Sequence, residues 1–427
     1  MTDGWVTGDH VGVRFPAHPA ALRDGGPAFL TDAFRAAGVL GADNRVVSVA
    51  RCGDVTGGST GRKMLLDVTY ARPQPALRTD LFVKFSRDLD DPVRDRGRTQ
   101  MAGEVAFARL AMAVDLPVAV PRPQFADYHT ATGTGILIAE RITFGDNGIE
   151  PQYHKCLDYT MPDAAGHYRA LLTALAQLAG ADRSGALPAG LTDALPVDLR
   201  AATVAEPPPV PAEKLDRRVR QLADFAVTHP GLLPERVRAA DFLGRLPVEA
   251  RRVRLGSDAV WRALAEASDY LALSHWNANV DNAWFWRDRV GTLHCGLLDW
   301  GCVSRLNVAM ALWGSLSAAE TTMWDECFDE FCELFCAVAA EAGGPDLDPA
   351  TLRRFVVLYA IVMGATWLLD VPALLRTRLP DAGPDTTRFD LRIAGDESLR
   401  APLQMLTNVL NLWATHDVAA EFARLPG

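Results

Sequence analysis

LSHWNANVDNAWF, residues 273–285, ends an apolar run with one histidine, three asparagines and one aspartate in close succession. The segment GLLDWG, residues 296–301, contains a second short apolar run, and this run ends at Asp299. The residues that join them, 283–299, predict a β-hairpin. Amide and carboxylate oxygens are donors that Mg²⁺ prefers, so Asn282 and Asp299 are candidate metal ligands beside a nucleotide.

Lys84 lies in LFVKF, where alternation places Leu81, Val83 and Phe85 on one face of a strand and Lys84 on the other. The chain has only four lysines among its 43 Lys and Arg residues, so the choice of lysine here is informative. A strand lysine can also pack its stem on the sheet and reach water with its ammonium group. Lys84 is therefore a candidate anion-binding residue, with a solvated lysine as the alternative.

The segment GDVTGGSTGR, residues 53–62, joins two predicted strands and carries four glycines. Glycines let backbone N–H groups approach an anion closely, so Gly57, Gly58 and Ser59 are candidate nucleotide-binding residues. No Gly-Lys-Ser/Thr sequence leads from this segment into a helix, which excludes a Walker loop. A plain turn is the alternative.

A predicted helix, MAGEVAFARLA at residues 101–111, contributes Glu104, the only glutamate between Lys84 and Ala139. A carboxylate on a helix packed over the sheet could hold the Lys84 ammonium group in place for the phosphates of a nucleotide. The alternative is a solvated charge on the helix surface.

Short β-rich runs bounded by turn residues dominate the first part of the chain, together with one helical segment. The runs are residues 45–53, 63–71, 80–85 and 135–142, and the helical segment is residues 27–38. This pattern predicts an α+β lobe on an antiparallel sheet, residues 1–142. Apolar residues at helical spacing from about Asp163 onward predict a mostly helical second lobe, residues 143–427. EPPPVPA, residues 206–212, predicts a connector inside that lobe.

The composition excludes several kinds of partner. The 427 residues carry a net charge of −10 and lack basic stripes, which argues against nucleic acid and favours a cationic or neutral small molecule. The longest apolar run, residues 355–369, is shorter than the ~20 residues that span a bilayer, so we expect a buried helix and no membrane partner. Seven cysteines and an N-terminus without a signal-peptide pattern lead us to expect a reduced, cytoplasmic protein with core cysteines.

The motifs around residues 275–300 resemble the aminoglycoside phosphotransferase and choline kinase branch of the protein-kinase-like superfamily, and most closely its ecdysteroid-kinase-like group. That branch reads His-Gly-Asp-x-x-x-x-Asn in its catalytic loop and Asp-Trp or Asp-Phe at its second metal site. Two positions differ, because Trp276 replaces the glycine and Asn277 replaces the catalytic aspartate. The matching positions are His275, Asn282, Asp299 and Trp300.

The resemblance covers roughly residues 28–320 and implies a two-lobed kinase fold. It implies ATP between the lobes, Mg²⁺ on Asn282 and Asp299, and a small-molecule acceptor held by helices of the second lobe. It also implies that Glu140 and Ile142, in the hinge sequence AERI, contact the nucleotide. His275 and Asn277 occupy the catalytic positions.

Two functions remain open. The first is an ATP- and Mg²⁺-dependent phosphotransferase acting on an alcohol or amino-alcohol, since kinase catalysis is mostly positioning and charge neutralisation. The second is a pseudokinase that binds a nucleotide or another ligand without phosphate transfer, because Asn277 cannot accept a proton. Asp281 is near in sequence, but we expect its side chain to point away from the acceptor.

An acidic helix is predicted at residues 316–335, LSAAETTMWDECFDEFCELF. Its carboxylates could draw a cationic acceptor toward the site, or could simply form a solvated helix face. The carboxylates are those of Glu320, Asp325, Glu326, Asp329, Glu330 and Glu333.

Overall fold

A computed structural model describes residues 4–55, 60–195, 199 and 210–425 of the chain. The contacts divide it into two compact units. The first unit comprises residues 1–149, 185–196 and 296–303, and the second comprises residues 150–184, 197–295 and 304–427.

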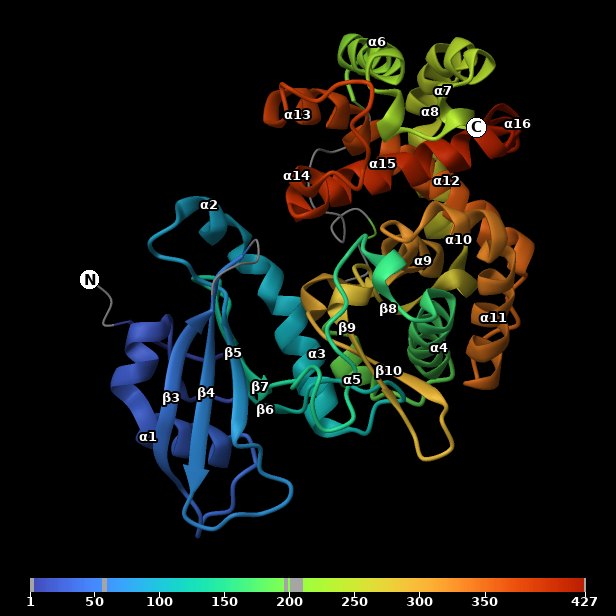
Figure 1. Ribbon diagram of the computed structural model, residues 1–427. Helices are drawn as coiled ribbons and strands as arrows, with labels where there is room; N and C mark the ends of the chain where they lie inside the picture. The colour runs from blue at the N-terminus through green and yellow to red at the C-terminus, as the bar shows by residue number, and fades with distance from the viewer. Residues whose placement is uncertain (1–3, 56–59, 196–198, 200–209, 426–427) are drawn as a thin grey trace. The chain divides into compact units, whose positions relative to one another are not determined.

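The first unit is built on a five-stranded antiparallel sheet (Figure 1), in the order β3-β4-β5-β7-β6. Two short strands, β1 and β2, pair separately. The strands are β1 (Trp5–Thr7), β2 (Arg14–Pro16), β3 (Val46–Val55), β4 (Arg62–Tyr70), β5 (Asp80–Phe85), β6 (Pro123–His129) and β7 (Thr134–Glu140). The helices of this unit are α1 (Pro19–Ala36), α2 (Pro92–Asp95), α3 (Met101–Ala113) and α5 (Ala189–Thr192). The predicted antiparallel α+β fold is confirmed.

The two faces of the sheet are covered by different helices. Helix α1 packs on one face, where Leu81, Val83 and Phe85 of β5 join a core of fully buried side chains. Helix α3 packs on the other face of β6 and β7, through a cluster that includes Val105 and Tyr128. The alternation predicted for β5 is therefore confirmed, and Lys84 points to the side opposite the α1 core.

Two local features of this unit differ from the expectation. Helix α1 begins at Pro19 and not near residue 27, with a kink at Gly26, where φ is 46°, followed by Pro27. The sequence PQFADYH of β6 carries no alternating pattern that would predict a strand, because six of its seven residues are buried. Its buried Asp127 accepts hydrogen bonds from the backbone N–H groups of His10 and Val11.

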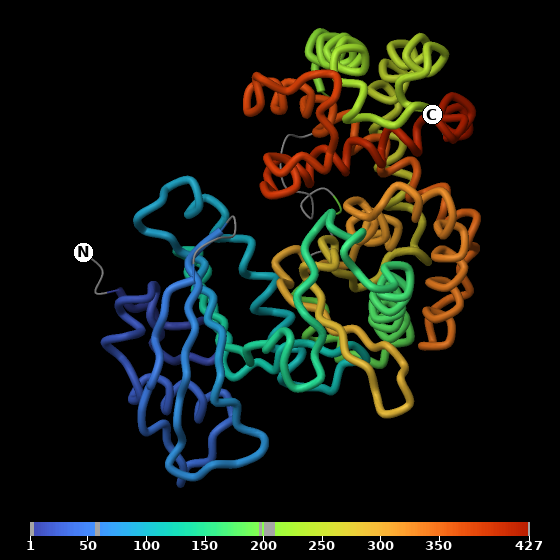
Figure 2. Tube along the Cα trace, in the orientation of Figure 1, coloured from blue at the N-terminus to red at the C-terminus, as the bar shows by residue number. Residues whose placement is uncertain are grey.

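The second unit is mostly helical, as predicted. Figure 2 shows α4 running beside α11, and these two helices share many contacts. The helices are α4 (Ala164–Arg183), α6 (Ala212–Thr228), α7 (Glu235–Arg238), α8 (Ala240–Glu266), α9 (Val308–Leu316), α10 (Thr321–Glu326), α11 (Phe328–Glu341), α12 (Pro349–Trp367), α13 (Val371–Arg378), α14 (Leu391–Ala394), α15 (Glu397–Thr415) and α16 (Val418–Ala423). Most of the predicted connector at 206–212 lies outside the described residues.

One long apolar helical stretch of the second unit is internal. The stretch Pro349–Arg378 is long and apolar enough to cross a membrane by length and composition alone, and 89% of its most apolar window is buried inside the protein. A mostly buried helix of this kind is typical of a protein core, as predicted for residues 355–369. Cys332 and Cys336 of α11 are also buried, which confirms them as core cysteines.

Short strands frame the polar loop after residue 275. Strand β8 (Leu271–His275) pairs with β11 (Val303–Asn307). The predicted hairpin is confirmed, and consists of β9 (Ala283–Arg287) and β10 (Leu293–Leu297).

Candidate functional site

In the first unit, Lys84 lies between two carboxylates. Its Nζ is 2.7 Å from Glu104 Oε1 and 2.6 Å from Asp299 Oδ1. The side chains of Lys84 and Glu104 are only 14% and 7% exposed, whereas that of Asp299 is 41% exposed. Strand β5, helix α3 and the segment after β10 thus meet at one ammonium group, and the Asp299 carboxylate stays open to solvent.

The electrostatics of this trio favour a permanent positive charge on Lys84. Burial by itself would lower the pKa of Lys84, but the carboxylates of Asp299 and Glu104 outweigh it and raise the pKa above its usual value. Burial raises the pKa of Glu104, against the attraction of Lys84 and together with the repulsion of Asp299. The ammonium group therefore stabilises two neighbouring negative charges that would otherwise repel each other.

Asp299 is held in a strained backbone conformation. Its φ is 63° and its ψ is 60°, in the left-handed region that non-glycine residues rarely adopt. The next residue, Trp300, donates its Nε1–H to Leu297 O and stacks on Phe107 with a centroid distance of 3.8 Å. Phe107 lies on α3, one turn after Glu104, so the same helix positions both carboxylates of the trio.

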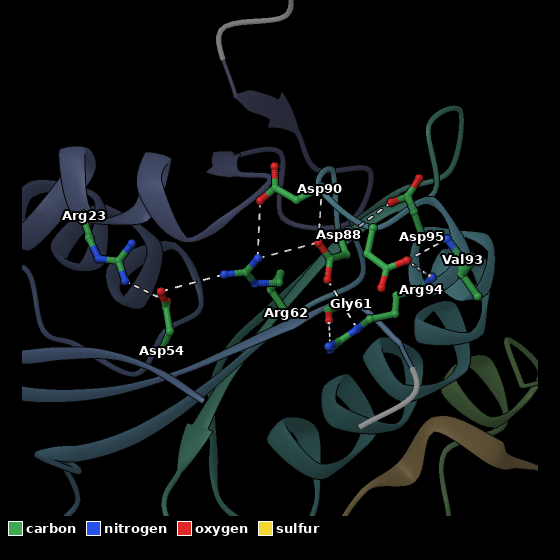
Figure 3. Close-up of polar contacts among 10 residues, drawn as sticks. Arg23, Asp54, Gly61, Arg62, Asp88, Asp90, Val93, Arg94 and Asp95 are labelled. Carbon is green, nitrogen blue, oxygen red and sulfur yellow. Dashed lines mark hydrogen bonds and ion pairs between the residues drawn. The ribbon is translucent and has the colours of Figure 1, made fainter. Parts of the chain in front are cut away.

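The two strands of the glycine-rich hairpin are tied together by ion pairs (Figure 3). Arg62 of β4 contacts Asp54 of β3, and Asp54 also pairs with Arg23 of α1 at 2.7 Å. On its other side Arg62 lies 3.4 Å from Asp90 and 3.7 Å from Asp88. The predicted nucleotide-binding residues Gly57, Gly58 and Ser59 lie outside the described residues.

Gly61 fixes how closely the hairpin approaches β5. Its φ is +55°, and a Cβ at this position would lie 1.8 Å from Phe85 O, so only glycine fits. Arg94 donates a hydrogen bond to Gly61 O (Figure 3). The end of the hairpin is therefore anchored from both sides, immediately before the strand residues that face Lys84.

The predicted hinge residues lie at the end of strand β7 and just after it. Glu140 is its last residue; its backbone N–H donates to Arg122 O, and its side chain lies 3.1 Å from Arg78. Ile142 lies two residues further and is partly buried. Their contacts with a nucleotide remain predictions.

In the second unit, the loop after β8 is closed by hydrogen bonds around Asn277. The Asn277 backbone N–H donates to His275 Nδ1 at 3.1 Å, and its carbonyl accepts from the Asn279 backbone N–H and from Asn282 Nδ2. Asn277 Oδ1 accepts from Asn279 Nδ2 at 2.8 Å. His275 is fully buried, so its role here is to orient the loop from within.

Two contacts with neighbouring helices fix the position of Trp276. Its Nε1–H donates to the hydroxyl of Tyr359 on α12 at 2.8 Å. Its carbonyl oxygen rests against Gly314 of α9, where a Cβ would come within 1.6 Å of that oxygen. The tryptophan that replaces the glycine of the family motif is therefore built into the packing of the second unit.

Asn282 presents an oxygen as its available ligand atom. Its Nδ2 is committed to the Asn277 carbonyl at 2.8 Å, which leaves the side-chain oxygen for a cation. An amide oxygen is a hard donor of the kind that Mg²⁺ prefers, as is the exposed carboxylate of Asp299 in the first unit. Asp281 lies beside an ammonium group, with Oδ2 3.6 Å from Lys155 Nζ.

The acidic helix is two helices, α10 and α11, separated at Cys327. Most of its carboxylates pair with arginines of the same unit. The pairs are Glu320–Arg388, Asp325–Arg236, Asp329–Arg353 and Glu330–Arg169. The expectation of an acidic field for a cationic acceptor is weakened by this pairing, and the solvated-face alternative is favoured.

Sequence reasoning missed one residue of the first unit. Lys63 of β4 is directly opposite Lys84 of β5 in the strand register. Alternation along β4 could have placed Lys63 on the face away from Met64, but its neighbour across the sheet depends on the pairing register. The register brings two of the chain's four lysines together.

No protein-family model matches the chain, and no curated protein matches it significantly. Several solved structures do match. Aminoglycoside 2′-phosphotransferase-IIIa in its GDP complex is 16% identical, with 84% of this chain and 93% of that chain covered and a TM-score of 0.40.

Two further matches are kinases of small amino-alcohols by name. Choline kinase from Cryptosporidium parvum is 11% identical, with 95% of this chain and 98% of that chain covered and a TM-score of 0.42. A microcompartment-associated aminopropanol kinase is 12% identical, with coverages of 91% and 96% and a TM-score of 0.40. These proteins are of the kind that the motifs at residues 275–300 resemble.

Proposed function

We propose that the protein is an ATP- and Mg²⁺-dependent phosphotransferase-family protein for a small-molecule hydroxyl, with weakened chemistry. The observation that carries this proposal is the Lys84 ammonium group, held between Glu104 and Asp299 beside the end of the glycine-rich hairpin. A lysine fixed by a helix carboxylate is the arrangement that positions nucleotide phosphates in kinases. The acceptor we propose is an alcohol or amino-alcohol.

Each residue has a distinct role in this proposal. Lys84 would bind phosphate oxygens, and Glu104 would keep its ammonium group in position. Asp299 and Asn282 would hold Mg²⁺, which neutralises the charge that develops on the transferred phosphoryl group. The strained backbone of Asp299 fits such a role, since strain of this kind gathers at functional sites.

Asn277 limits the chemistry. An amide can orient an acceptor hydroxyl by hydrogen bonding but cannot take its proton at neutral pH. The loss of a general base commonly lowers the rate by about 10² to 10⁴. Asp281 is a poor substitute because its carboxylate is drawn to Lys155.

The same residue favours a second candidate function, a pseudokinase that holds a nucleotide without using it. The hydrogen bonds around Asn277 hold the loop in its conformation. A ligand-binding site could therefore be kept in a protein that transfers no phosphate. A neutral side chain at this position would also not repel the γ-phosphate of ATP. We further propose a cytoplasmic location, supported by seven cysteines that form no disulfide.

Calorimetric titration with ATP, with and without Mg²⁺, tests nucleotide binding. Wild type is expected to bind ATP more tightly with Mg²⁺, and Asp299→Ala is expected to abolish that difference. A phosphate-release assay over alcohol and amino-alcohol acceptors then separates the two functions. No heat with millimolar ATP and Mg²⁺ would refute both.

A further inference from the structure

Lys63 and Lys84 form a cross-strand pair of like charge. They are directly opposite in the antiparallel β4–β5 register, so both side chains project from the same face of the sheet. That face is the one opposite the α1 core, because the alternating residue Met64 is fully buried in that core. Like charges directly opposite each other in a sheet are destabilising, so this pairing needs a reason.

The ammonium group of Lys63 lacks a committed carboxylate. Within residues 4–55, 60–195, 199 and 210–425, no ion pair of Lys63 lies within 4 Å, whereas Lys84 has two. Burial lowers the pKa of Lys63, Asp299 opposes this effect, and Lys84 adds to it. Lys63 therefore shares the electrostatic environment of the trio without being neutralised by a contact of its own.

The neighbouring cation shows the contrast. Arg62 points to the other face of β4 and is surrounded by Asp54, Asp88 and Asp90 (Figure 3). Its charge is already used to tie the hairpin strands together. Lys63 is the next residue and lies two positions after the tightly packed Gly61. It faces Lys84 and, among the described residues, has no carboxylate partner like those of Arg62.

We propose that Lys63 is a second phosphate-binding residue, whose ammonium group contacts the polyphosphate chain of a nucleotide beside Lys84. This inference rests on the proposed function and adds a residue to the same site. An anion between the two ammonium groups would convert their repulsion into attraction to a common partner. The hairpin end, fixed by Gly61, would hold Lys63 ready for that contact.

The test compares nucleotides that differ only in phosphate. Calorimetric titrations with ATP, ADP and adenosine, all with Mg²⁺, are run on wild type, Lys63→Met, Lys63→Arg and Lys84→Met. Lys214→Met, on α6 of the second unit, is the matched control because it removes the same charge elsewhere. We expect Lys63→Met to weaken ATP and ADP binding about tenfold or more and to leave adenosine binding unchanged. Lys63→Arg should stay within about threefold of wild type, and the control should not change.

Several outcomes would overturn the inference. If Lys63→Met binds ATP like wild type while Lys84→Met does not, Lys63 only balances charge and the proposed function stands. An equal loss of adenosine and ATP affinity would also refute a phosphate contact. If wild type binds no ATP, the proposed function and this inference fail together.

Thermal unfolding without nucleotide shows whether Lys63→Met is folded. We expect the same Tm as wild type or a higher one, since a like-charge repulsion is removed. Should this variant not fold, Lys63→Gln takes its place: ATP binding much weaker than in Lys63→Arg supports the inference, and equal binding in the two variants overturns it.

Discussion

The two candidate regions of this molecule differ in charge. Around Lys84 the side chains are ionic: its ammonium group has short contacts with Glu104 and Asp299, and Lys63 lies opposite it in the sheet. Around Asn277 the polar groups are amides and backbone, joined by neutral hydrogen bonds. In the proposed function, the phosphate-binding lysine and the metal-binding carboxylate of Asp299 belong to the ionic region, and a neutral side chain occupies the position of the proton acceptor. In the proposed function, this difference separates nucleotide binding from phosphate transfer.

Removal of Lys84 is the strongest test of the ionic region. In Lys84→Met the buried Glu104 and its neighbour Asp299 lose their shared cation, which should lower the free energy of unfolding by about 3 kcal/mol or more. Urea unfolding at pH 7 measures this change. The additional substitution Glu104→Gln should recover much of it, and an unchanged stability in Lys84→Met would show that the pair is not coupled.

A matched pair of glycines tests the packing of the neutral loop. Gly314→Ala would bring a Cβ within 1.6 Å of Trp276 O, so we expect a loss of about 2 to 3 kcal/mol in unfolding free energy. Gly244→Ala, in helix α8, meets nothing within 4 Å and should be neutral or stabilising. The result would contradict the structure if the two substitutions had equal effects in urea unfolding.

A buried carboxyl in the second unit should be neutral at mildly acidic pH. Asp158 is 2% exposed, and burial raises its pKa to about 7, although Tyr168 and the Glu320 N–H donate hydrogen bonds to it. Because the unfolded chain loses this proton near pH 4 and the folded chain only near pH 7, stability should fall as pH rises between these values.

From pH 5 to pH 7 this loss should be about 2 kcal/mol. Asp158→Asn mimics the neutral form and should remove that part of the pH dependence. Urea unfolding of both proteins at pH 5, 6, 7 and 8 measures it. Parallel curves for wild type and variant would show that Asp158 is ionised throughout.

Asn277→Asp tests the neutral region directly. The new carboxylate can accept the acceptor's proton, so we expect phosphate transfer to rise at least tenfold when acceptor, ATP and Mg²⁺ are present. The built-in Trp276 limits the gain. Asn279→Asp, in the same loop, is the control for an added charge. A wild type that is already fast, and that Asn277→Asp leaves unchanged or impairs, would mean that another residue is the base.

The sequence predicted the structural features that depend on a local residue pattern. Alternation in β5 placed Lys84 on its face, and the strand signals gave most of the sheet. It could not predict features set by tertiary pairing. Strand β6 is buried on both faces and keeps Asp127 inside by binding backbone N–H groups of residues 10 and 11. The Lys63–Lys84 pair depends on a register between two strands.

The candidate site shows the same division. The types and order of Asn282 and Asp299 in the sequence predicted them as candidate metal ligands. The sequence did not predict the left-handed backbone conformation of Asp299. The next residue, Trp300, stacks on Phe107, and this contact joins segments far apart in sequence. The close contact between the Trp276 carbonyl oxygen and Gly314 likewise comes from tertiary packing that no local sequence pattern encodes.

The hydrogen bond that orients Asn282 ends on the backbone carbonyl of residue 277 and does not involve its side chain. The identity of side chain 277 and the orientation of the amide at 282 are therefore independent of each other. An evolving lineage could lose or regain a proton acceptor by one substitution at 277 while the rest of the loop stays under selection for ligand binding. Under the proposed function, a loss of turnover by this route would be reversible.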